Sequence, residues 1–529
     1  MQFIYNFKQG YAEGNKDMLD ILGGKGANLA EMCNLSIPVP PGFTIIPEAS
    51  KFFISNKFDS HDKFKFNVQF DESLKNLETS TNSTLASELN PCILSVRSGS
   101  KESMPGMMDT ILNLGLNDCV VENLIKKTGN SYFAYDSYRR FIQTYGTVVL
   151  DIDSKLFEEK LECLETPTSE ELKNICMEFK QIIRDCGKRL PSNSNDQLQE
   201  AIKAVFNSWY SDRAKTYRQM HGISDDIGTA VNIQAMVFGN KDEHSLTGVL
   251  FSRDCLSGSA TMTGEYLLKS QCEDIVGGIV TPNPLSLKSS KEIALKIGYS
   301  EEDRILKLIS LEEINNNLFK DLIKLSKKLE HHYRDVQDIE FTVEDGKLWI
   351  LQTRLAKKTN RANVIIQKNL FIEGIISEDE LLDRTQRFKL EPTNKFVFKN
   401  NDDKDKKLLL VGLAVSSGLA TGKIVFDPKE AVKKVDQDVI LVRDQTDTHD
   451  LEGILAAKGT LTAKGGTTSH AAVVCREANL CCVIGSRINI NLVTKTVQIG
   501  DETFKEGDWI SLDGDSGEIF KGKLTISQE

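Results

Sequence analysis

The sequence lacks several features that would assign it to a specialised class of protein. No apolar run approaches the roughly 18–20 residues that a membrane-spanning helix needs. The first eight residues carry neither the charged nor the apolar segment of a signal peptide. There are 11 cysteines but no Cys-x-x-Cys pair, and an odd, scattered set fits a reducing compartment better than a disulfide framework. We therefore expect a cytoplasmic protein with no membrane partner.

Basic residues are also fewer than acidic residues. Lys and Arg total 65 against 76 Asp and Glu, which gives a formal net charge of −11. A nucleic-acid-binding surface needs clustered basic residues, so this balance argues against a nucleic-acid partner. It does not argue against nucleotide binding, which uses a few local residues. The length of 529 residues suggests about three or four domains.

A Walker-type phosphate loop is missing. The segment Gly418–Lys423 is one residue short of the required spacing and is followed by isoleucine instead of serine or threonine. We interpret it as a glycine-rich turn. If the chain binds ATP, it does so through another arrangement.

One histidine, His470, stands where a flexible loop meets a predicted helix. Two glycines at 465–466 permit a tight bend, and the hydroxyls of residues 467–469 are good N-caps. Residues 471–478 have a helical pattern, so His470 falls in the first turn, where free N–H groups and the helix dipole favour an anion. Neutral imidazole is a nucleophile near pH 7 and can carry a phosphoryl group. A capped helix with an incidental histidine is the alternative.

The same run carries a family resemblance. Gly-Gly-Thr-Thr-Ser-His-Ala-Ala-Val-Val, continuing to Cys481–Gly485, resembles the phosphohistidine motif of the pyruvate phosphate dikinase family. That group includes phosphoenolpyruvate synthase and enzyme I of the sugar phosphotransferase system, and this histidine is its phosphoryl carrier. Thr467 stands where the family often has Met. Thr468 matches a regulatory phosphorylation site of the plant enzyme, although a simple helix-end hydroxyl is the preferred interpretation.

Three further segments have residues that suit a nucleotide site. Lys25 lies within a glycine turn, where a flexible point charge suits phosphate oxygens. Arg97 leaves a predicted strand into a Gly/Ser-rich loop, whose many donors can cover a polyphosphate chain. Glu273 belongs to an acidic pair that precedes two glycines. Each segment alone is weak, because such turns and surface charges are common.

A fourth segment is a predicted hairpin that turns at Asp345–Gly346. Strand alternation puts Asp338 and Glu340 on one face, about 7 Å apart, where two carboxylates can hold a hydrated divalent cation. On the return strand Gln352 and Arg354 share a face. The alternative is a solvated acidic face with a surface cation.

All four segments, in this order, resemble the ATP-grasp-type nucleotide domain of the dikinases. The resemblance implies that Lys25, Arg97 and Arg354 contact phosphates and that Asp338 and Glu340 bind Mg²⁺. The full set of nucleotide- and phosphate-binding residues that it implies is Lys25, Arg97, Ser103, Gly106, Met107, Asp109, Thr110, Glu273, Gln352 and Arg354. The loop 103–110 closes over the phosphates in the family. Its form looks like the dikinase, which passes one phosphoryl group to inorganic phosphate, rather than the synthase, which passes it to water.

The resemblance also implies a fold class, multidomain α/β and α+β. The expected parts are an ATP-grasp-like domain (1–117 and 200–355), a helical insertion (118–199), a helical linker or hinge (356–407) and an α/β phosphohistidine domain (408–525) that swivels. The linker ends in a charged run at 400–407 with no apolar residue.

The implied activity is transfer of a phosphoryl group from ATP, with Mg²⁺ and inorganic phosphate, to His470, giving AMP and pyrophosphate. The family's β/α barrel, which needs about 250 residues and converts pyruvate to phosphoenolpyruvate (PEP), has no counterpart in this sequence. Pyruvate and PEP are therefore expected as partners only through a missing or separate barrel. Because the family dimerises largely through the barrel, we expect a monomer or weak oligomer. The alternatives are a PEP-synthase-like or other phosphotransferase with a different acceptor, and a non-catalytic nucleotide-binding regulator.

Overall fold

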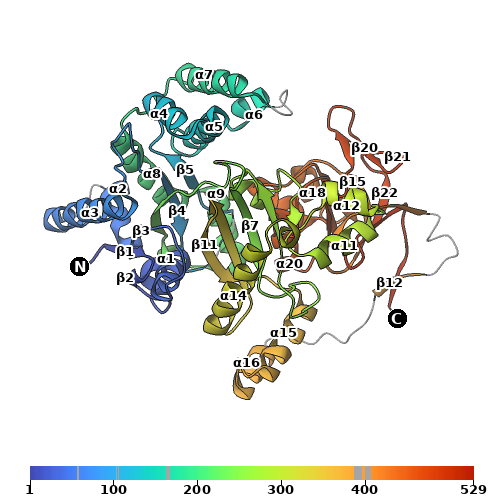
Figure 1. The fold of residues 1–529 in the computed structure, drawn as a ribbon. Coiled ribbons are helices and arrows are strands. Elements are labelled where there is room, and N and C mark those ends of the chain that lie inside the picture. The colour runs from blue at the N-terminus through green and yellow to red at the C-terminus, as the bar shows by residue number, and fades with distance from the viewer. Residues whose placement is uncertain are drawn as a thin grey trace. The chain divides into compact units, whose positions relative to one another are not determined.

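The computed structural model describes residues 1–55, 59–102, 104, 106–161, 167–386, 396–399 and 407–528. The chain divides into two compact units (Figure 1). Unit 1 comprises Met1–Ser245 and Thr342–Thr353, and unit 2 comprises Leu246–Phe341 and Arg354–Glu529. Ser103 of the predicted phosphate loop and residues 387–395 and 400–406 of the predicted linker lie outside the described residues.

Unit 1 is built on an antiparallel sheet with strand order β2-β1-β3-β6-β4-β5. Ile233 lies at its centre, fully buried, between Phe43 on one neighbouring strand and Val96 on the other. Strand β6, the last strand of this sheet in sequence, thus lies in the middle of the sheet and pairs with the earlier strands β3 and β4. The strands are β1 (Ile4–Lys8), β2 (Tyr11–Ala12), β3 (Gly42–Ile45), β4 (Leu94–Gly99), β5 (Thr110–Leu114) and β6 (Ala230–Ala235).

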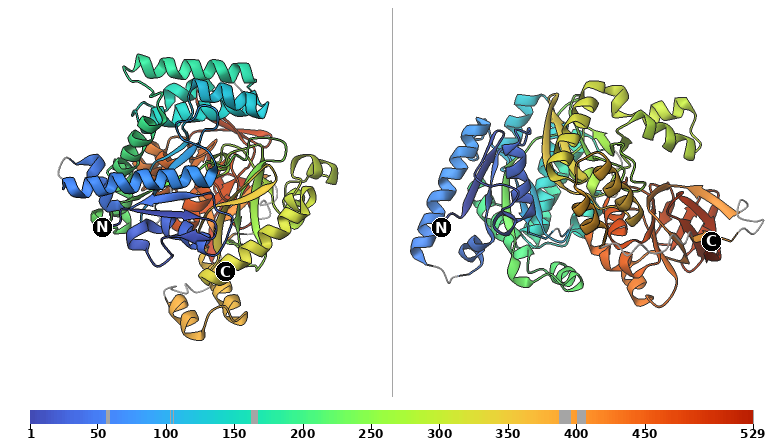
Figure 2. Two further views of the ribbon diagram at one scale, coloured as in Figure 1. Left: turned by 60° about the vertical axis from the view of Figure 1, so that its left-hand side comes forward. Right: turned by 90° about the horizontal axis from the view of Figure 1, so that it is seen from below.

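Helices cover this sheet because each has one apolar face. Helix α3 (Ser60–Thr81) lies along β1 and β3 (Figure 2) and buries Phe66, Phe70 and Leu77, which recur at helical spacing. It begins where the Asp59 carboxylate accepts two backbone N–H groups, the usual role of an N-cap. The other helices on this part of the chain are α1 (Leu19–Asn34), η1 (Pro47–Ser50) and α2 (Lys51–Ile54).

Between β5 and β6 the chain is helical. Helix α7 (Ser169–Asp185) starts with a capping box formed by Thr168 and Glu171, and it buries Leu172, Ile175 and Phe179 along one face. These side chains pack into the same hydrophobic core as the sheet. The remaining elements are α4 (Asp118–Thr128), α5 (Ser131–Val148), α6 (Lys155–Leu161), α8 (Ser194–Ser208), α9 (Asp212–His221) and η2 (Asp225–Ile227).

The predicted hairpin is present as β10 (Gln337–Glu344) and β11 (Lys347–Leu355), in a sheet of order β11-β10-β7-β8-β9. Its turn residues Asp345 and Gly346 have φ of 51° and 75°, the left-handed pair that a tight hairpin turn requires. Both faces of β10 are buried as far as Val343, so the polar face is not a solvated one. The other strands are β7 (Leu246–Phe251), β8 (Thr263–Leu268) and β9 (Asn283–Pro284).

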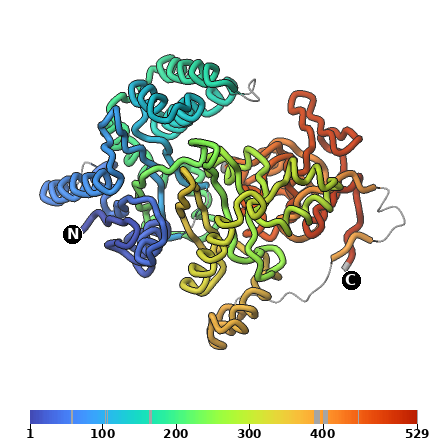
Figure 3. The backbone as a smooth tube through the Cα atoms, in the orientation of Figure 1, coloured from blue at the N-terminus to red at the C-terminus, as the bar shows by residue number. Residues whose placement is uncertain are grey.

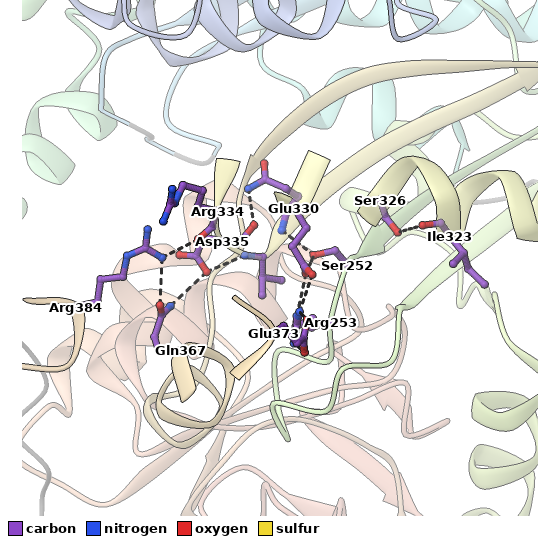
Figure 4. A network of polar contacts seen from close by, with 12 residues as sticks. Ser252, Arg253, Ile323, Ser326, Glu330, Arg334, Asp335, Gln367, Glu373 and Arg384 are labelled. Atoms are coloured by element: carbon purple, nitrogen blue, oxygen red, sulfur yellow. Dashed lines mark hydrogen bonds and ion pairs between the residues drawn. The ribbon is translucent and has the colours of Figure 1, made fainter. Parts of the chain in front are cut away.

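A buried ion-pair network braces the start of β10 (Figure 4). Arg253, which is 3% exposed, donates to Glu330 at 2.8 and 3.0 Å and to Glu373 at 2.8 Å. Ser252 donates to Glu330 at 2.6 Å and accepts the backbone N–H of Gln337 at 3.1 Å. The network therefore joins the end of β7 to the beginning of β10. The helices of this region are α10 (Cys272–Val276), α11 (Leu287–Lys296), α12 (Glu301–Lys307), α13 (Leu311–Ile314), α14 (Asn316–Tyr333), α15 (Asn360–Ile372) and α16 (Glu378–Gln386).

The C-terminal part of unit 2 holds a mixed sheet of order β13-β23-β22-β15-β16-β17-β18-β14, drawn from orange to red in Figure 3. Strands β15 to β18 run parallel, and helices α18, α19 and α20 connect them. The strands are β13 (Leu408–Val411), β14 (Leu413–Ser416), β15 (Leu419–Val425), β16 (Val439–Arg443), β17 (Gly459–Thr462), β18 (Cys481–Ile484), β22 (Trp509–Asp513) and β23 (Glu518–Lys521), and the helices are α18 (Pro428–Lys433), η3 (Thr448–Asp450), α19 (Leu451–Ala456) and α20 (His470–Ala478).

Two small sheets complete unit 2. One contains β19 (Asn489–Asn491), β20 (Thr496–Ile499) and β21 (Glu502–Lys505), and the other pairs β12 (Phe396–Phe398) with β24 (Ile526–Gln528). Cysteines within the described ranges are all free thiols, with Cys481 and Cys482 buried in β18 and Cys119 and Cys186 exposed. Across the described parts of both units, no helix combines the length and apolar content that crossing a bilayer would need.

Candidate functional site

The predicted helix after the glycine loop begins at His470, as expected. Ser469 is the N-cap residue, with φ −65° and ψ 162°, and the helix ends at the left-handed Asn479. Gly465 has φ 102°, a conformation that favours glycine, so the bend predicted there is confirmed. The Ser469 hydroxyl makes no capping bond, and its buried oxygen has no hydrogen-bond partner among the described residues. Backbone geometry, and not this side chain, therefore starts the helix.

The His470 imidazole is half-buried with one nitrogen engaged. Its Nδ1 lies 3.4 Å from the Thr446 hydroxyl, while its buried Nε2 has no hydrogen-bond partner within the described part of the chain. Burial lowers the pKa of His470 to about 4, against an opposing effect from the nearby carboxylate of Asp447. The ring is therefore neutral near pH 7, which is the nucleophilic form.

A buried glutamate binds the loop that precedes the histidine. Glu265 on β8 is 5% exposed, and its Oε1 accepts the backbone N–H of Thr467 at 2.7 Å. Its Oε2 accepts the backbone N–H and the hydroxyl of Thr468 at 3.3 and 3.1 Å. A side chain at Gly466 would place its Cβ 2.3 Å from Oε2, so any larger residue there would displace the carboxylate. Sequence reasoning missed Glu265.

An arginine on α20, also not predicted, binds the same loop. Arg476 donates to the carbonyl oxygen of Thr467 at 2.5 Å and to that of Ala472 at 3.1 Å. Its guanidinium stacks over the Phe251 ring at 5.1 Å from the centroid. The backbone N–H of Thr467 thus donates to the Glu265 carboxylate, and its carbonyl oxygen accepts from the Arg476 guanidinium.

In unit 1, the glycine turn around Lys25 packs against the end of β4. Helix α1 is kinked at Gly23, where φ is 66°, and a Cβ there would lie 1.8 Å from the carbonyl oxygen of Gly99. The backbone N–H of Gly24 donates to the carbonyl of Ser100 at 2.8 Å. The glycine turn around Lys25 and the end of β4, which lie more than 70 residues apart in sequence, are therefore in close backbone contact.

Arg97 and Gln352 come together in the same unit. A terminal nitrogen of the Arg97 guanidinium lies 3.5 Å from Gln352 Oε1. The side chain of Asn28, on α1, donates to the carbonyl of Thr353 at 3.0 Å. These contacts bring the return strand of the hairpin to the helix that carries Lys25. Three predicted phosphate-binding residues thus gather in unit 1.

The predicted phosphate loop is held at its far end by another arginine. Arg213 pairs with Asp109 and donates to the carbonyl of Met107 at 3.2 Å. Thr110 opens β5 directly opposite Arg97 in the strand register. Gly106 has φ 72° and is exposed. Asp109 is therefore occupied by an ion pair that the sequence did not indicate.

In unit 2, Asp338 accepts a hydrogen bond from Arg354 at 2.7 Å. Burial raises the pKa of Asp338, Arg354 lowers it, and the neighbouring Glu340 raises it. Asp338 is the main cause of a raised pKa at Arg354. The second Asp338 oxygen is buried and has no hydrogen-bond partner among the described residues. The two carboxylates suit Mg²⁺, which usually takes one or two carboxylates and fills its shell with phosphate and water oxygens.

The described residues contain no cluster of three or more His, Cys, Asp or Glu side chains arranged for a metal ion. A pair such as Asp338 and Glu340 is the smaller donor set expected of a site that metal and nucleotide share. Glu273 lies exposed on α10, and the following Gly278, with φ 70°, approaches Ser469 at 3.4 Å for a built Cβ. The third predicted segment therefore borders the histidine loop.

The predicted residues fall into two groups according to unit. Unit 1 contains Lys25, Arg97, Gly106, Met107, Asp109, Thr110 and Gln352. Unit 2 contains Glu273, Asp338, Glu340, Arg354, Thr468 and His470.

Two family models match the chain. The model described as pyruvate phosphate dikinase, AMP/ATP-binding domain, matches residues 19–371. The model described as PEP-utilising enzyme, mobile domain, matches residues 435–517. The first match covers more than half of the chain, and it contains both the Lys25 and the Arg354 segments.

Curated relatives match over the whole chain. Pyruvate, phosphate dikinase of Clostridium symbiosum is 42% identical over 542 residues, which is 100% of this chain and 59% of the relative. The enzyme of the same name from Rhizobium meliloti is 41% identical, over 100% of this chain and 58% of the relative. Pyruvate, phosphate dikinase 2 of Oryza sativa is 40% identical, over 99% and 58%. The chain thus spans about three fifths of the length of these relatives.

Proposed function

Because the chain belongs to the pyruvate phosphate dikinase family, we propose that it is a phosphotransferase that uses ATP to phosphorylate its own His470. The observation that carries this proposal is the state of the imidazole. His470 is neutral near pH 7, stands at a helix N-terminus behind a glycine bend, and has an Nε2 atom with no partner within the described residues. These are the properties of a nitrogen nucleophile placed to receive an anionic group.

The proposed reaction uses Nε2 as the attacking atom. When Nδ1–H donates to Thr446, the lone pair is left on Nε2. Nε2 forms a bond to the β-phosphorus of ATP, and the bond from that phosphorus to the AMP oxygen breaks, so AMP leaves with its electron pair. The γ-phosphoryl group then passes to inorganic phosphate, which gives pyrophosphate and leaves one phosphoryl group on His470. Thr446 would hold the ring orientation through both steps.

Cationic side chains would hold the triphosphate. Lys25, Arg97 and Arg354 are proposed to bind its oxygens, and Gln352 lies beside Arg97. Asp338 and Glu340 would hold Mg²⁺, and the Asp338 oxygen that lacks a partner among the described residues supports this assignment. Mg²⁺, when bound, neutralises charge that develops on the transferring phosphoryl group. The loop at 106–110 and Glu273 are proposed to complete the nucleotide site.

The domain arrangement is proposed from the same family membership. Residues 1–117 and 200–355 would form an ATP-grasp-like domain, interrupted by the helical insertion at 118–199. The segment 356–407 would be the linker that lets the phosphohistidine domain, 408–525, move between sites. The match of residues 435–517 to a mobile domain supports this proposal.

The final acceptor is proposed from the names of the relatives. They are pyruvate, phosphate dikinases, so pyruvate and phosphate are the proposed partners of the complete reaction. The segment of the relatives that this chain does not span would carry the pyruvate step. We expect the chain alone to catalyse only the ATP- and phosphate-dependent half.

Incubation with ATP labelled at the β-phosphorus tests the proposal. With Mg²⁺ and phosphate, the chain should acquire an acid-labile, alkali-stable label. His470→Gln should acquire none while it binds ATP with unchanged Kd, and His244→Gln, which alters an exposed histidine, should be labelled like the natural chain. Label in His470→Gln at the natural level would refute the assignment.

A further inference from the structure

Unit 2 contains a cavity of about 320 Å³ that the proposed reaction does not use. Pro284 of β9, Ile293 of α11 and Ile297, which follows α11, form one part of its wall. Leu410 of β13 and Leu413 of β14 form another part. We call this space the α11 cavity. Its size and its mainly apolar lining are typical of sites that bind small molecules.

Two basic side chains also line the α11 cavity, Lys296 at the end of α11 and Arg487 beyond β18. Neither forms an ion pair with a carboxylate of the described residues. Arg487 donates instead to the Tyr299 hydroxyl, and its guanidinium stacks on the Tyr299 ring at 4.6 Å from the centroid. Burial lowers the pKa of Arg487. A cation in this setting is stabilised by an anion placed beside it.

The backbone conformation of Arg487 is one that few residues other than glycine adopt. Its φ is 53°, in the left-handed region. The N–H of Arg487 donates to the carbonyl of Ala463 at 3.2 Å, and that of Ser486 donates to the carbonyl of Thr462 at 3.2 Å. These bonds hold a strained residue beside the cavity, and retained strain of this kind is concentrated at functional sites.

The charges around the α11 cavity fit one negative charge. Lys296 and Arg487 are opposed by one acidic lining residue, Glu265, whose oxygens accept hydrogen bonds from Thr467 and Thr468. Two positive charges and one negative charge sum to +1 when Glu265 is ionised. A monoanion therefore complements the lining, whereas a doubly charged phosphate would place excess negative charge near Glu265.

We propose that the α11 cavity binds a small monocarboxylate with an apolar body. The body would fill the space lined by α11, β13 and β14, and Arg487 and Lys296 would bind the carboxylate. A guanidinium suits this group because it donates two parallel N–H bonds to the two oxygens. Tyr299 would keep the guanidinium plane in place. The proposal does not depend on phosphorylation of His470.

Calorimetric titration of the full chain with 2-naphthoate tests the site. This probe should bind saturably at one site per chain. The alcohol 2-naphthalenemethanol has the same apolar body without the charge, so it should bind at least about tenfold more weakly, because a charge-assisted hydrogen bond is lost. Absence of saturable 2-naphthoate binding at millimolar concentration, or equal Kd values for the acid and the alcohol, would overturn the proposal.

Variants of the lining show where the probe binds. Arg487→Gln should raise the Kd for 2-naphthoate at least about tenfold, and Leu413→Trp should prevent binding because the larger side chain fills the cavity. Lys288→Gln, the matched control, changes an exposed residue of α11 outside the lining and should leave the Kd unchanged. Arg487 lies at the surface, so its variant decides the question even if Leu413→Trp does not fold. A natural Kd in Arg487→Gln, or in folded Leu413→Trp, would overturn the proposal.

Discussion

Arg354 donates to Asp338 at 2.7 Å, so a residue proposed to bind phosphate neutralises one proposed to bind metal. Asp338 is 5% exposed and Arg354 is only partly so. Each group has an alternative partner in the proposed Mg²⁺–ATP complex. In the chain without nucleotide, this ion pair therefore gives the Asp338 carboxylate and the Arg354 guanidinium a partner of opposite charge.

Removal of both members of this pair should cost less than the sum of the two single removals. Arg354→Met leaves a buried carboxylate unpaired and should lower the free energy of unfolding by about 3 kcal/mol. In the double variant Asp338→Asn/Arg354→Met, the loss should be smaller than the sum of the single losses. Urea unfolding of the four proteins measures the coupling, and strictly additive losses would contradict it.

His470 should titrate well below an ordinary histidine. Its pKa of about 4 means that the folded chain keeps the ring neutral, while the unfolded chain protonates it near 6.5. This lowered pKa contributes stability that is complete above about pH 6.5 and is lost as the pH falls towards 4. Carbon-13 NMR of labelled histidines should show one of seven signals titrating near pH 4, absent in His470→Gln. A midpoint near 6.5 for that signal would contradict the burial.

Gly466→Ala should be tolerated only when Glu265 is shortened. The added methyl would overlap the carboxylate, and overpacking of this kind costs about 1–3 kcal/mol. In a Glu265→Ala background the space is open, so the same substitution should cost much less. Thermal unfolding of the single and double variants measures the difference. An equal cost in both backgrounds would place the clash elsewhere.

Lys25→Met should weaken ATP binding without unfolding unit 1. Loss of one charge-assisted bond to phosphate should raise the Kd for Mg²⁺–ATP about 10- to 100-fold, since such bonds contribute about 1.5–3 kcal/mol. Lys101→Met is the matched control, because Lys101 forms an exposed pair with Asp20. Calorimetric titration of both variants provides the test, and equal Kd values would remove Lys25 from the site.

Acid should weaken unit 2 through Glu313. Hydrogen bonds from Arg304 hold the pKa of Glu313 at about 2, below its ordinary value of 4.5. The ionised carboxylate therefore contributes stability above about pH 4.5, and this contribution is lost as the pH falls towards 2. The difference in unfolding free energy between the natural chain and Arg304→Met should narrow over that interval. A constant difference from pH 5 to 2 would show that Glu313 is not the titrating partner.

Local patterns predicted the local structure well. Alternation of Ile339, Phe341 and Val343 with polar residues, followed by Asp345–Gly346, specifies a hairpin whatever surrounds it. The helix that starts at His470 follows from a glycine bend and an uninterrupted helical run. In both cases the determining interactions lie within a few residues of each other.

Contacts between remote segments could not be predicted in this way. Glu265 is one charged residue in an otherwise ordinary strand, and its role depends on amides 202 residues away. Arg213 likewise pairs with Asp109, 104 residues away, and Arg476 stacks on the ring of the remote Phe251, so both contacts arise only through packing of distant elements. The hydroxyl of Ser469 shows the converse, because its sequence position suggested a cap that it does not make.

The buried free thiols of unit 2 can report on local opening of its C-terminal sheet. Cys481 and Cys482 are buried in β18, and burial raises the pKa of the first while Cys475 and burial raise that of the second. At neutral pH an alkylating reagent therefore reacts first with Cys119 and Cys186, which are exposed. Slow modification of Cys481 and Cys482 then measures how often β18 separates from its neighbouring strands. The rate of this modification therefore reports local opening of the sheet beneath His470.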